Sequence, residues 1–176
     1  VSVTPGVNNA TSLALFAKYG ADGLEKCAAD NNLEVNFSAC ANEEECALAL
    51  LTASYHAGID IIDASDIGEA LKVEAKKMLA EKPNNRFRLK AIAGGGGKGQ
   101  RILQSANSYE GSTLEEKVDK AAEVVPSLAL ECLIELKTNG VGDNKNVLLE
   151  MNIDTTRHQE IQVLGNGEWC MTMGGR

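Results

Sequence analysis

The chain has 176 residues, of which 44% are hydrophobic and 4% aromatic, so it can bury one core, or two small cores joined by a cleft. Its formal net charge of −8 argues against a surface for nucleic acid or anionic membrane, because such partners usually require a clustered basic face. The longest apolar run, near Ala47–Leu51, is too short to span a bilayer, and the first residues lack the pattern of a signal peptide. We therefore expect a cytoplasmic protein.

Cysteine usage supports the same compartment. The number of cysteines is odd and no CxxC pair occurs, so neither a disulfide framework nor a zinc site is indicated. The chain also begins without methionine and stops at MTMGGR, which suggests a piece of a longer protein. We expect reduced thiols at Cys27, Cys40, Cys46, Cys132 and Cys170.

The first elements in chain order are a helical region and a short strand. Residues 11–31 have apolar residues at helical spacing interrupted by two glycines, which predicts one broken helix or two short ones. Residues 33–37, LEVNF, are a strand candidate. Residues 42–58 predict a helix with acidic residues in its first turn and Gly58 at its end.

A strand and a long helix are expected next. The run that starts at Ile59, IDIIDA, is typical of a buried strand, and Ser65 can cap a helix over Asp66–Glu81 that ends before Pro83. The order strand, helix, strand, helix predicts a mainly helical α/β arrangement for the first half of the chain.

The second half predicts a small α+β unit with an antiparallel sheet. FRLKAIA and QRILQSA flank four glycines as two strands of a hairpin or long loop. The next segments, separated by Pro126, form one kinked helix or two helices that end at Gly140. NVLLEMN, RHQEIQVLG and GEWCMTM are predicted strands, and the last two pair through a turn at Gly165–Gly167.

The glycine run could hold phosphate. Gly94, Gly96 and Gly99 satisfy GxGxxG, but a strand follows them where a dinucleotide site needs a helix, and a P-loop needs Ser or Thr after Lys98. A protein-kinase loop has valine where Arg101 stands. A glycine loop between antiparallel strands can instead place backbone N–H groups over phosphates. The alternative is a surface hairpin tip without a ligand.

Lys90 favours a ligand. Strand alternation puts Arg88, Lys90 and Ile92 on one face and Leu89, Ala91 and Ala93 on the other. A lysine inside an apolar strand is costly to bury unless it meets an anion, although it could also extend to solvent from an edge strand.

The last third adds a second polar strip. Alternation in RHQEIQVLG places His158, Glu160 and Gln162 on one face, and Ile161 and Val163 on the other, where core contact is expected. Glu150, at the end of an apolar run, could accept a hydrogen bond from an adenine amino group. The alternative for each residue is a solvated strand position.

Two stretches, LKAIAGGGGKGQRIL and LLEMNIDTTRHQEIQVLGNGEW, resemble the biotin carboxylase component of acetyl-CoA, propionyl-CoA and pyruvate carboxylases, which are ATP-grasp ligases. From about Phe87 onward the chain resembles the mobile B subdomain that folds over ATP, and VTPG resembles the segment leading into it. The resemblance implies an ATP-grasp B-subdomain-like sheet over residues 87–176, preceded by an unassigned insertion over residues 1–86. Residues 13–64 have no counterpart in that family.

The resemblance assigns ATP contacts by position. Lys90 matches a lysine that contacts the nucleotide, Glu150 matches the acceptor of the adenine amino group, and Met151 and Ile153 lie where backbone groups meet the adenine edge. His158 matches a histidine near the nucleotide. Arg88 departs from the pattern, which has an apolar residue beside adenine, and Met151 replaces a lysine. The loop over the phosphates matches Gly94, Gly95, Gly96, Gly97, Lys98 and Gly99.

The implied reaction is the ATP- and bicarbonate-dependent carboxylation of biotin through carboxyphosphate, with Mg²⁺ on the phosphates. A biotin carrier domain and a carboxyltransferase would be the partners of the parent enzyme. No residue of this chain matches the family's catalytic or metal-binding positions, so we expect the chain alone to be inert. Two alternatives stay open: an ATP-grasp ligase for a different acid, and a non-catalytic scaffold or interaction module of a larger carboxylase.

Overall fold

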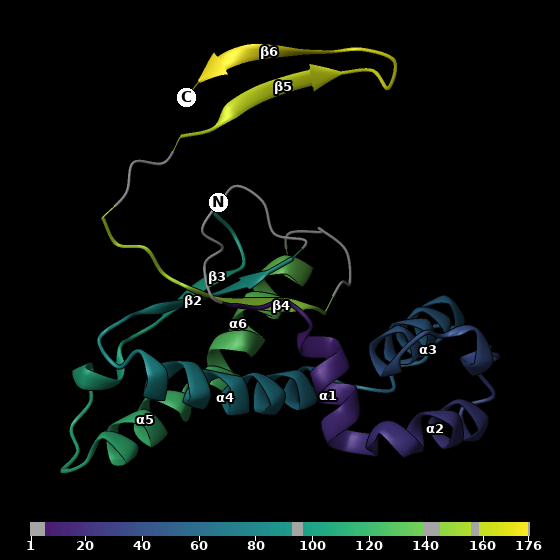
Figure 1. The fold of residues 1–176 in the computed structure, drawn as a ribbon, viewed down its shortest axis with the longest axis horizontal. Helices are drawn as coiled ribbons and strands as arrows, with labels where there is room; N and C mark the ends of the chain where they lie inside the picture. Colours follow the sequence, from purple (N-terminus) through teal and green to yellow (C-terminus); the bar gives the residue numbers. More distant parts are fainter. Residues whose placement is uncertain (1–5, 93–96, 139–144, 156–158, 176) are drawn as a thin grey trace.

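The computed structural model describes residues 6–92, 97–138, 145–155 and 159–175, and it has an α+β fold with antiparallel sheets (Figure 1). Short 3-10 turns lie at Ala21–Gly23, Phe37–Ala39 and Ala106–Ser108. The helices are α1 (Ala10–Tyr19), α2 (Leu24–Asp30), α3 (Glu43–Ala57), α4 (Ala64–Glu81), α5 (Leu114–Ala122) and α6 (Val125–Thr138). The strands are β1 (Gly6–Val7), β2 (Phe87–Ala91), β3 (Gln100–Leu103), β4 (Val147–Met151), β5 (Ile161–Gly165) and β6 (Cys170–Gly175).

The first three helices confirm two predictions. The broken helical region is two helices, α1 and α2, interrupted at Gly20, whose φ of 72° favours glycine. Helix α3 begins after Asn42, whose side chain accepts the Glu45 N–H at 2.9 Å, and it ends at Gly58 in the left-handed conformation with a φ of 67°. Local capping signals therefore set both ends of α3.

The two strands predicted in the first half are wrong. In LEVNF, the Leu33 N–H bonds to the Ala28 carbonyl and closes α2, and residues 37–39 form a 3-10 turn. The run from Ile59 is an irregular connection in which the neighbouring Ile61 and Ile62 are both buried. Both stretches are apolar because they cover the core between helices, so residues 8–86 of the chain are helical with irregular connections and not α/β.

The predicted helix before Pro83 is confirmed, but its cap is Asp63, not Ser65. The Asp63 carboxylate accepts the N–H groups of Ser65 at 2.8 Å and Asp66 at 2.9 Å. The Asp66 carboxylate accepts the Asp63 N–H in return at 2.9 Å, which completes a capping box. Because Asp63 satisfies two helix N–H groups, α4 starts one residue before Ser65.

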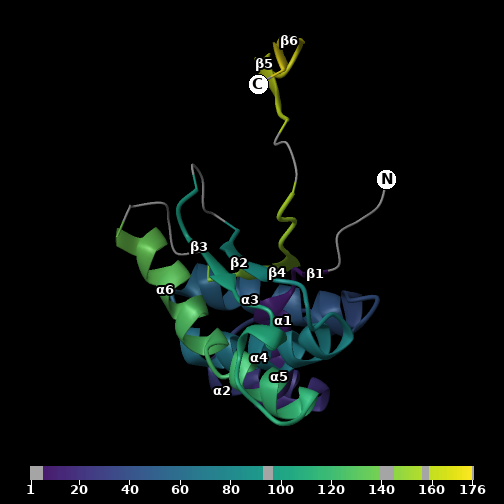
Figure 2. The same ribbon diagram turned by 90° about the vertical axis from the view of Figure 1, so that its left-hand side faces the viewer.

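The main sheet has the strand order β1-β4-β2-β3, and each neighbouring pair is antiparallel. Alternate residues of β2 and β4 are buried in the core. Helices α4 and α6 pack on that side of the sheet (Figures 1 and 2). The buried row of the sheet consists of Phe87, Leu89, Ala91, Leu103, Val147 and Leu149.

Helix α4 links the predicted insertion, residues 1–86, to the predicted subdomain, residues 87–176, because it packs against α1 of the former and against α5 and α6 of the latter. A side chain at Gly68 would lie 2.8 Å from the Cα atom of Pro126, in the first turn of α6, so the two helices approach closely there. The predicted helices around Pro126 are separate helices, α5 and α6, with Pro126 tolerated near the start of α6. Residues before and after position 86 therefore share one core.

The predicted pairing of the last two strands is confirmed. β5 and β6 form an antiparallel hairpin whose turn is fixed by Asn166, which accepts the Glu168 and Trp169 N–H groups at 3.1 Å. The hairpin stands apart from the main sheet in both views (Figures 1 and 2). The expected core contact of Ile161 and Val163 is wrong within the described chain, because these side chains are 65% and 54% exposed.

Candidate functional site

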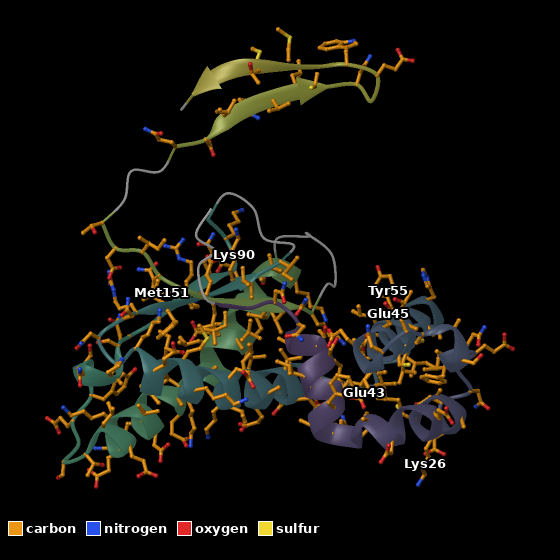
Figure 3. The ribbon with its side chains drawn as sticks, in the orientation of Figure 1. Lys26, Glu43, Glu45, Tyr55, Lys90 and Met151 are labelled. Carbon is orange, nitrogen blue, oxygen red and sulfur yellow. The ribbon has the colours of Figure 1, made fainter. Side chains whose placement is uncertain are left out.

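The candidate site lies on the outer face of the main sheet, which we define as the face turned away from α4 and α6. The predicted alternation of β2 is confirmed: Leu89 is buried against the helices, whereas Arg88 and Lys90 are half-buried on the outer face. Figure 3 shows Lys90 on this face of the sheet, on the side away from α4. Its strand neighbours on the same face are Gln100 in β3 and Leu148 in β4.

Glu150 lies on the same face. It is directly opposite Arg88 across the β2–β4 ladder, which makes it a diagonal neighbour of Lys90. Glu150 is half-buried, as is Lys90. Within the described ranges, neither side chain makes a hydrogen bond or an ion pair, so an ammonium group and a carboxylate share one face with their charges uncommitted. Partly buried charges without a protein partner are suited to a polar, charged ligand.

The VTPG segment ends beside Glu150. Gly6 pairs with Glu150 and Val7 with Leu149, so β1 forms the edge of the sheet next to the candidate acceptor. A Cβ atom at Gly6 would lie 2.8 Å from the Leu149 carbonyl oxygen, which is too close for any side chain. Glycine at this position therefore permits the approach of β1 to β4.

Arg88 is held in place along the same face. Its Nη2 and Nε atoms donate to the Asn152 side-chain oxygen at 2.7 and 3.2 Å, and its Nη1 atom donates to Gln100 at 3.3 Å. Asn152 is itself 8% exposed and donates to Asp154, which also binds Arg86. The hydrogen bond from Arg86 holds the pKa of the Asp154 carboxyl below its usual range. The guanidinium group of Arg88 is thus fixed by Asn152 and Gln100 and does not turn away into solvent.

This polar network was missed by the sequence analysis. Asn152 and Asp154 follow the end of β4, and Arg86 precedes the start of β2. Extending the period-two alternation of the strands by one step in each direction would have placed Arg86 and Asn152 on the face of Lys90. The signal was therefore present, at positions just outside the apolar runs.

The glycine loop is described only at its exit. Gly94, Gly95 and Gly96 lie outside the described residues, whereas Gly97 and Gly99 have φ values of 83° and 67°, which favour glycine. Between them Lys98 is exposed. The Ala91 N–H donates to the Gly99 carbonyl at 2.9 Å, so the predicted strand pairing continues up to Gly99. The loop therefore leaves the sheet at the end where Lys90 lies.

The remaining predicted contacts are placed differently. The Met151 side chain packs against the core and accepts a hydrogen bond from Asn85 at 3.3 Å, so it belongs to the inner face (Figure 3). Ile153 is 52% exposed after the end of β4, and His158 lies outside the described residues. Thus Lys90 and Glu150 share the outer face, whereas Met151 could offer a ligand only backbone atoms.

Comparisons of the chain with models of known protein families, with curated proteins and with solved structures found no match. In the described part of the chain, no helix is long and apolar enough to cross a membrane. The same residues contain no group of three or more His, Cys, Asp or Glu side chains that could hold a metal ion. All five cysteines are free thiols, as the sequence predicted.

Proposed function

We propose that this chain is the ATP-binding part of a biotin-dependent carboxylase, in which ATP and bicarbonate carboxylate biotin. The observation that carries the proposal is the pair of uncommitted charges, Lys90 and Glu150, on one sheet face beside a glycine-loop exit. The sequence resemblance adds the identity of the ligand. The partners would be a biotin carrier domain and a carboxyltransferase of the parent enzyme.

Residues of opposite charge would bind different parts of the nucleotide. Lys90 would pair with a phosphate oxygen, and Lys98 at the loop exit would add a second positive charge to the triphosphate. Glu150 would accept the adenine amino group, because an ionised carboxylate is an acceptor only. The fixed guanidinium of Arg88 would lie beside the base, where a planar cation can stack on a ring.

Magnesium does not fit a site built from the described residues, because they contain no group of three or more His, Cys, Asp or Glu side chains that could hold a metal ion. We therefore assign no step to a metal held by this part of the chain. Mg²⁺ would arrive with ATP, bound to its phosphates. The chain would bind and orient the nucleotide, while the groups that act on bicarbonate and biotin would belong to the parent enzyme.

The test is a titration of the ¹⁵N-labelled chain with MgATP, followed by NMR up to millimolar nucleotide. We expect amide shifts at Lys90, Gly97–Gly99 and Glu150, and we expect Lys90→Ala to weaken binding about tenfold, because a charge-assisted hydrogen bond contributes roughly 1.5–3 kcal/mol. Lys77→Ala is the matched control: it also removes one positive charge, but from the surface of α4, where Lys77 pairs with Glu74. Shifts that avoid the outer face, or equal effects of the two variants, would refute the proposal.

The hairpin favours a second candidate, an interaction module. Both faces of β5 and β6 are exposed, and an isolated two-stranded hairpin is marginally stable in water. Its exposed apolar residues are typical of a surface that a protein partner covers. If MgATP leaves the outer face unchanged in the titration, this function becomes the better one. An ATP-grasp ligase for a different acid would give the same shifts as the carboxylase part, and would differ in the acid that the parent enzyme requires.

A further inference from the structure

The exit of the glycine loop, Gly97–Gly99, rests on helix α6. Gly99 is buried, and a Cβ atom added there would lie 3.1 Å from a methyl carbon of Leu136. The Gly99 N–H helps to hold the pKa of the Glu135 carboxyl below its usual range, and the Gly99 carbonyl accepts the Ala91 N–H at 2.9 Å. Backbone pairing, close packing and a carboxylate thus all act on one residue of the loop exit.

Glu135 is in turn fixed by Arg101. Arg101 lies opposite the buried Leu89, so its side chain leaves the inner face of the sheet toward α6. Its Nη1 atom donates to Glu135 at 2.7 Å and to the Gln100 carbonyl at 2.8 Å, and its Nε atom donates to Glu131 at 2.7 Å. Two carboxylates therefore neutralise Arg101, whose charge is used within the protein and not on the outer face.

The contacts of Gly99 also restrict the position of the neighbouring charged residue, Lys98. It lies between two glycines with positive φ, where the backbone has many accessible conformations unless one side is anchored. The anchor at Gly99 acts from the helix side of the sheet, which leaves the outer side open to a ligand. The nearby Lys98 and Arg101 both help to hold the pKa of Glu135 low, with the Arg101 hydrogen bond as the largest cause.

We propose that Glu135, held by Arg101, is a positioning residue that fixes the loop exit so that Lys98 meets the phosphates of the nucleotide in one orientation. The inference rests on the proposed function, since it assigns the ligand of the loop exit as a triphosphate. Glu135 touches no ligand itself. It lowers the conformational entropy that Lys98 loses when the phosphates bind.

The test compares Glu135→Gln with Glu131→Gln. Both variants remove a carboxylate that binds Arg101 at 2.7 Å from the same helix, but the Gly99 contact is given by Glu135. We expect Glu135→Gln to raise the hydrogen exchange rate of the Gly99 amide and to weaken MgATP binding about three- to tenfold, as expected for ordering one further flexible side chain. Glu131→Gln should change both quantities much less. In Glu135→Gln the amide oxygen of the new side chain can still accept a hydrogen bond. Glu135→Ala removes this acceptor as well and should show the larger effect.

Two readouts separate the possible failures. Hydrogen exchange at Gly99 is measured without nucleotide, so it tests the anchor alone, and MgATP affinity tests its consequence. If the Gly99 amide exchanges faster in Glu135→Gln while MgATP affinity stays at the wild-type value, the positioning role is refuted although the proposed function stands. Equal effects of Glu131→Gln and Glu135→Gln also refute it. If the wild-type chain shows no MgATP shift, the proposed function fails, and the positioning role fails with it.

Discussion

The substitution Gly68→Ala tests the close approach of α4 and α6 beneath the candidate site. Alanine inside a helix is more favourable than glycine by about 1 kcal/mol, so at an open position this substitution would stabilise the protein. At Gly68 the added Cβ atom would lie 2.8 Å from Pro126 Cα and 3.0 Å from Pro126 Cβ. Carbon atoms in contact prefer a separation of about 3.5–4.0 Å, so one helix has to move.

Whether Gly68→Ala stabilises or destabilises the protein depends on whether the gain in helix propensity exceeds the cost of overpacking. Overpacking that forces a backbone shift costs roughly 1–3 kcal/mol, and Pro126 offers backbone and ring atoms that cannot rotate away. After subtracting the gain in helix propensity, we expect a net loss of about 1 kcal/mol of unfolding free energy. For a domain of this size that loss lowers the melting temperature by about 2–4 °C.

The assay is urea unfolding followed by circular dichroism, with Glu69→Ala as the control. Glu69 is the next residue of the same helix and is exposed, so its substitution should leave the urea midpoint nearly unchanged. A Gly68→Ala protein whose midpoint rises, with an unchanged dependence on urea, would show that the helices are farther apart than described. The reasoning about α4 and α6 would then be wrong.

Two further predictions concern titratable groups. Although desolvation acts to raise it, the pKa of Asp66 lies below its usual value because Lys18, at 2.7 Å, and the Asp63 N–H stabilise the carboxylate. The stability from Asp66 should therefore be present above its unfolded pKa of about 3.9 and be lost as the pH falls through the lower folded value. The urea midpoints of the wild type and Asp66→Asn should differ at pH 7, and this difference should shrink as the pH falls below that range. A difference that grows on acidification would contradict this. Among the thiols, the exposed Cys170 should react first with Ellman's reagent in the native protein. Cys132 should react only after unfolding, because burial raises its pKa to about 11 and blocks access. Early labelling at Cys132, read by mass spectrometry, would contradict its burial.

The elements that the sequence predicted correctly are those with strong local signals. Asn42 and Gly58 cap α3 through bonds to neighbouring residues, and the strands on either side of the glycines pair as a hairpin whose register is nearly local. The alternation of Lys90 with Leu89 was also enough to assign the two faces of β2. In each case the deciding interactions lie within a few residues or across one turn.

The elements that were missed depend on distant contacts. Ile61 and Ile62 are apolar like a strand, but burial of two consecutive residues between helices does not require a partner strand. The fixing of Arg88 depends on Asn152, which lies 64 positions away in the sequence. No local pattern could show that this amide oxygen would meet the guanidinium, because the pairing is set by the register of β2 and β4.

The packing of α4 also links the stability of the core to the geometry of the candidate site. Ile67, Leu71 and Ala75 recur at helical spacing and are buried in the same cluster as Leu89 and Leu149. Leu89 alternates with Lys90, and Leu149 alternates with Glu150, so any shift of the inner row moves the outer row with it. A side chain at Gly68 would therefore act on two levels. It would lower stability by separating α4 from α6, and it would displace β2 and β4, whose outer face carries the two charges on which the proposed nucleotide binding depends.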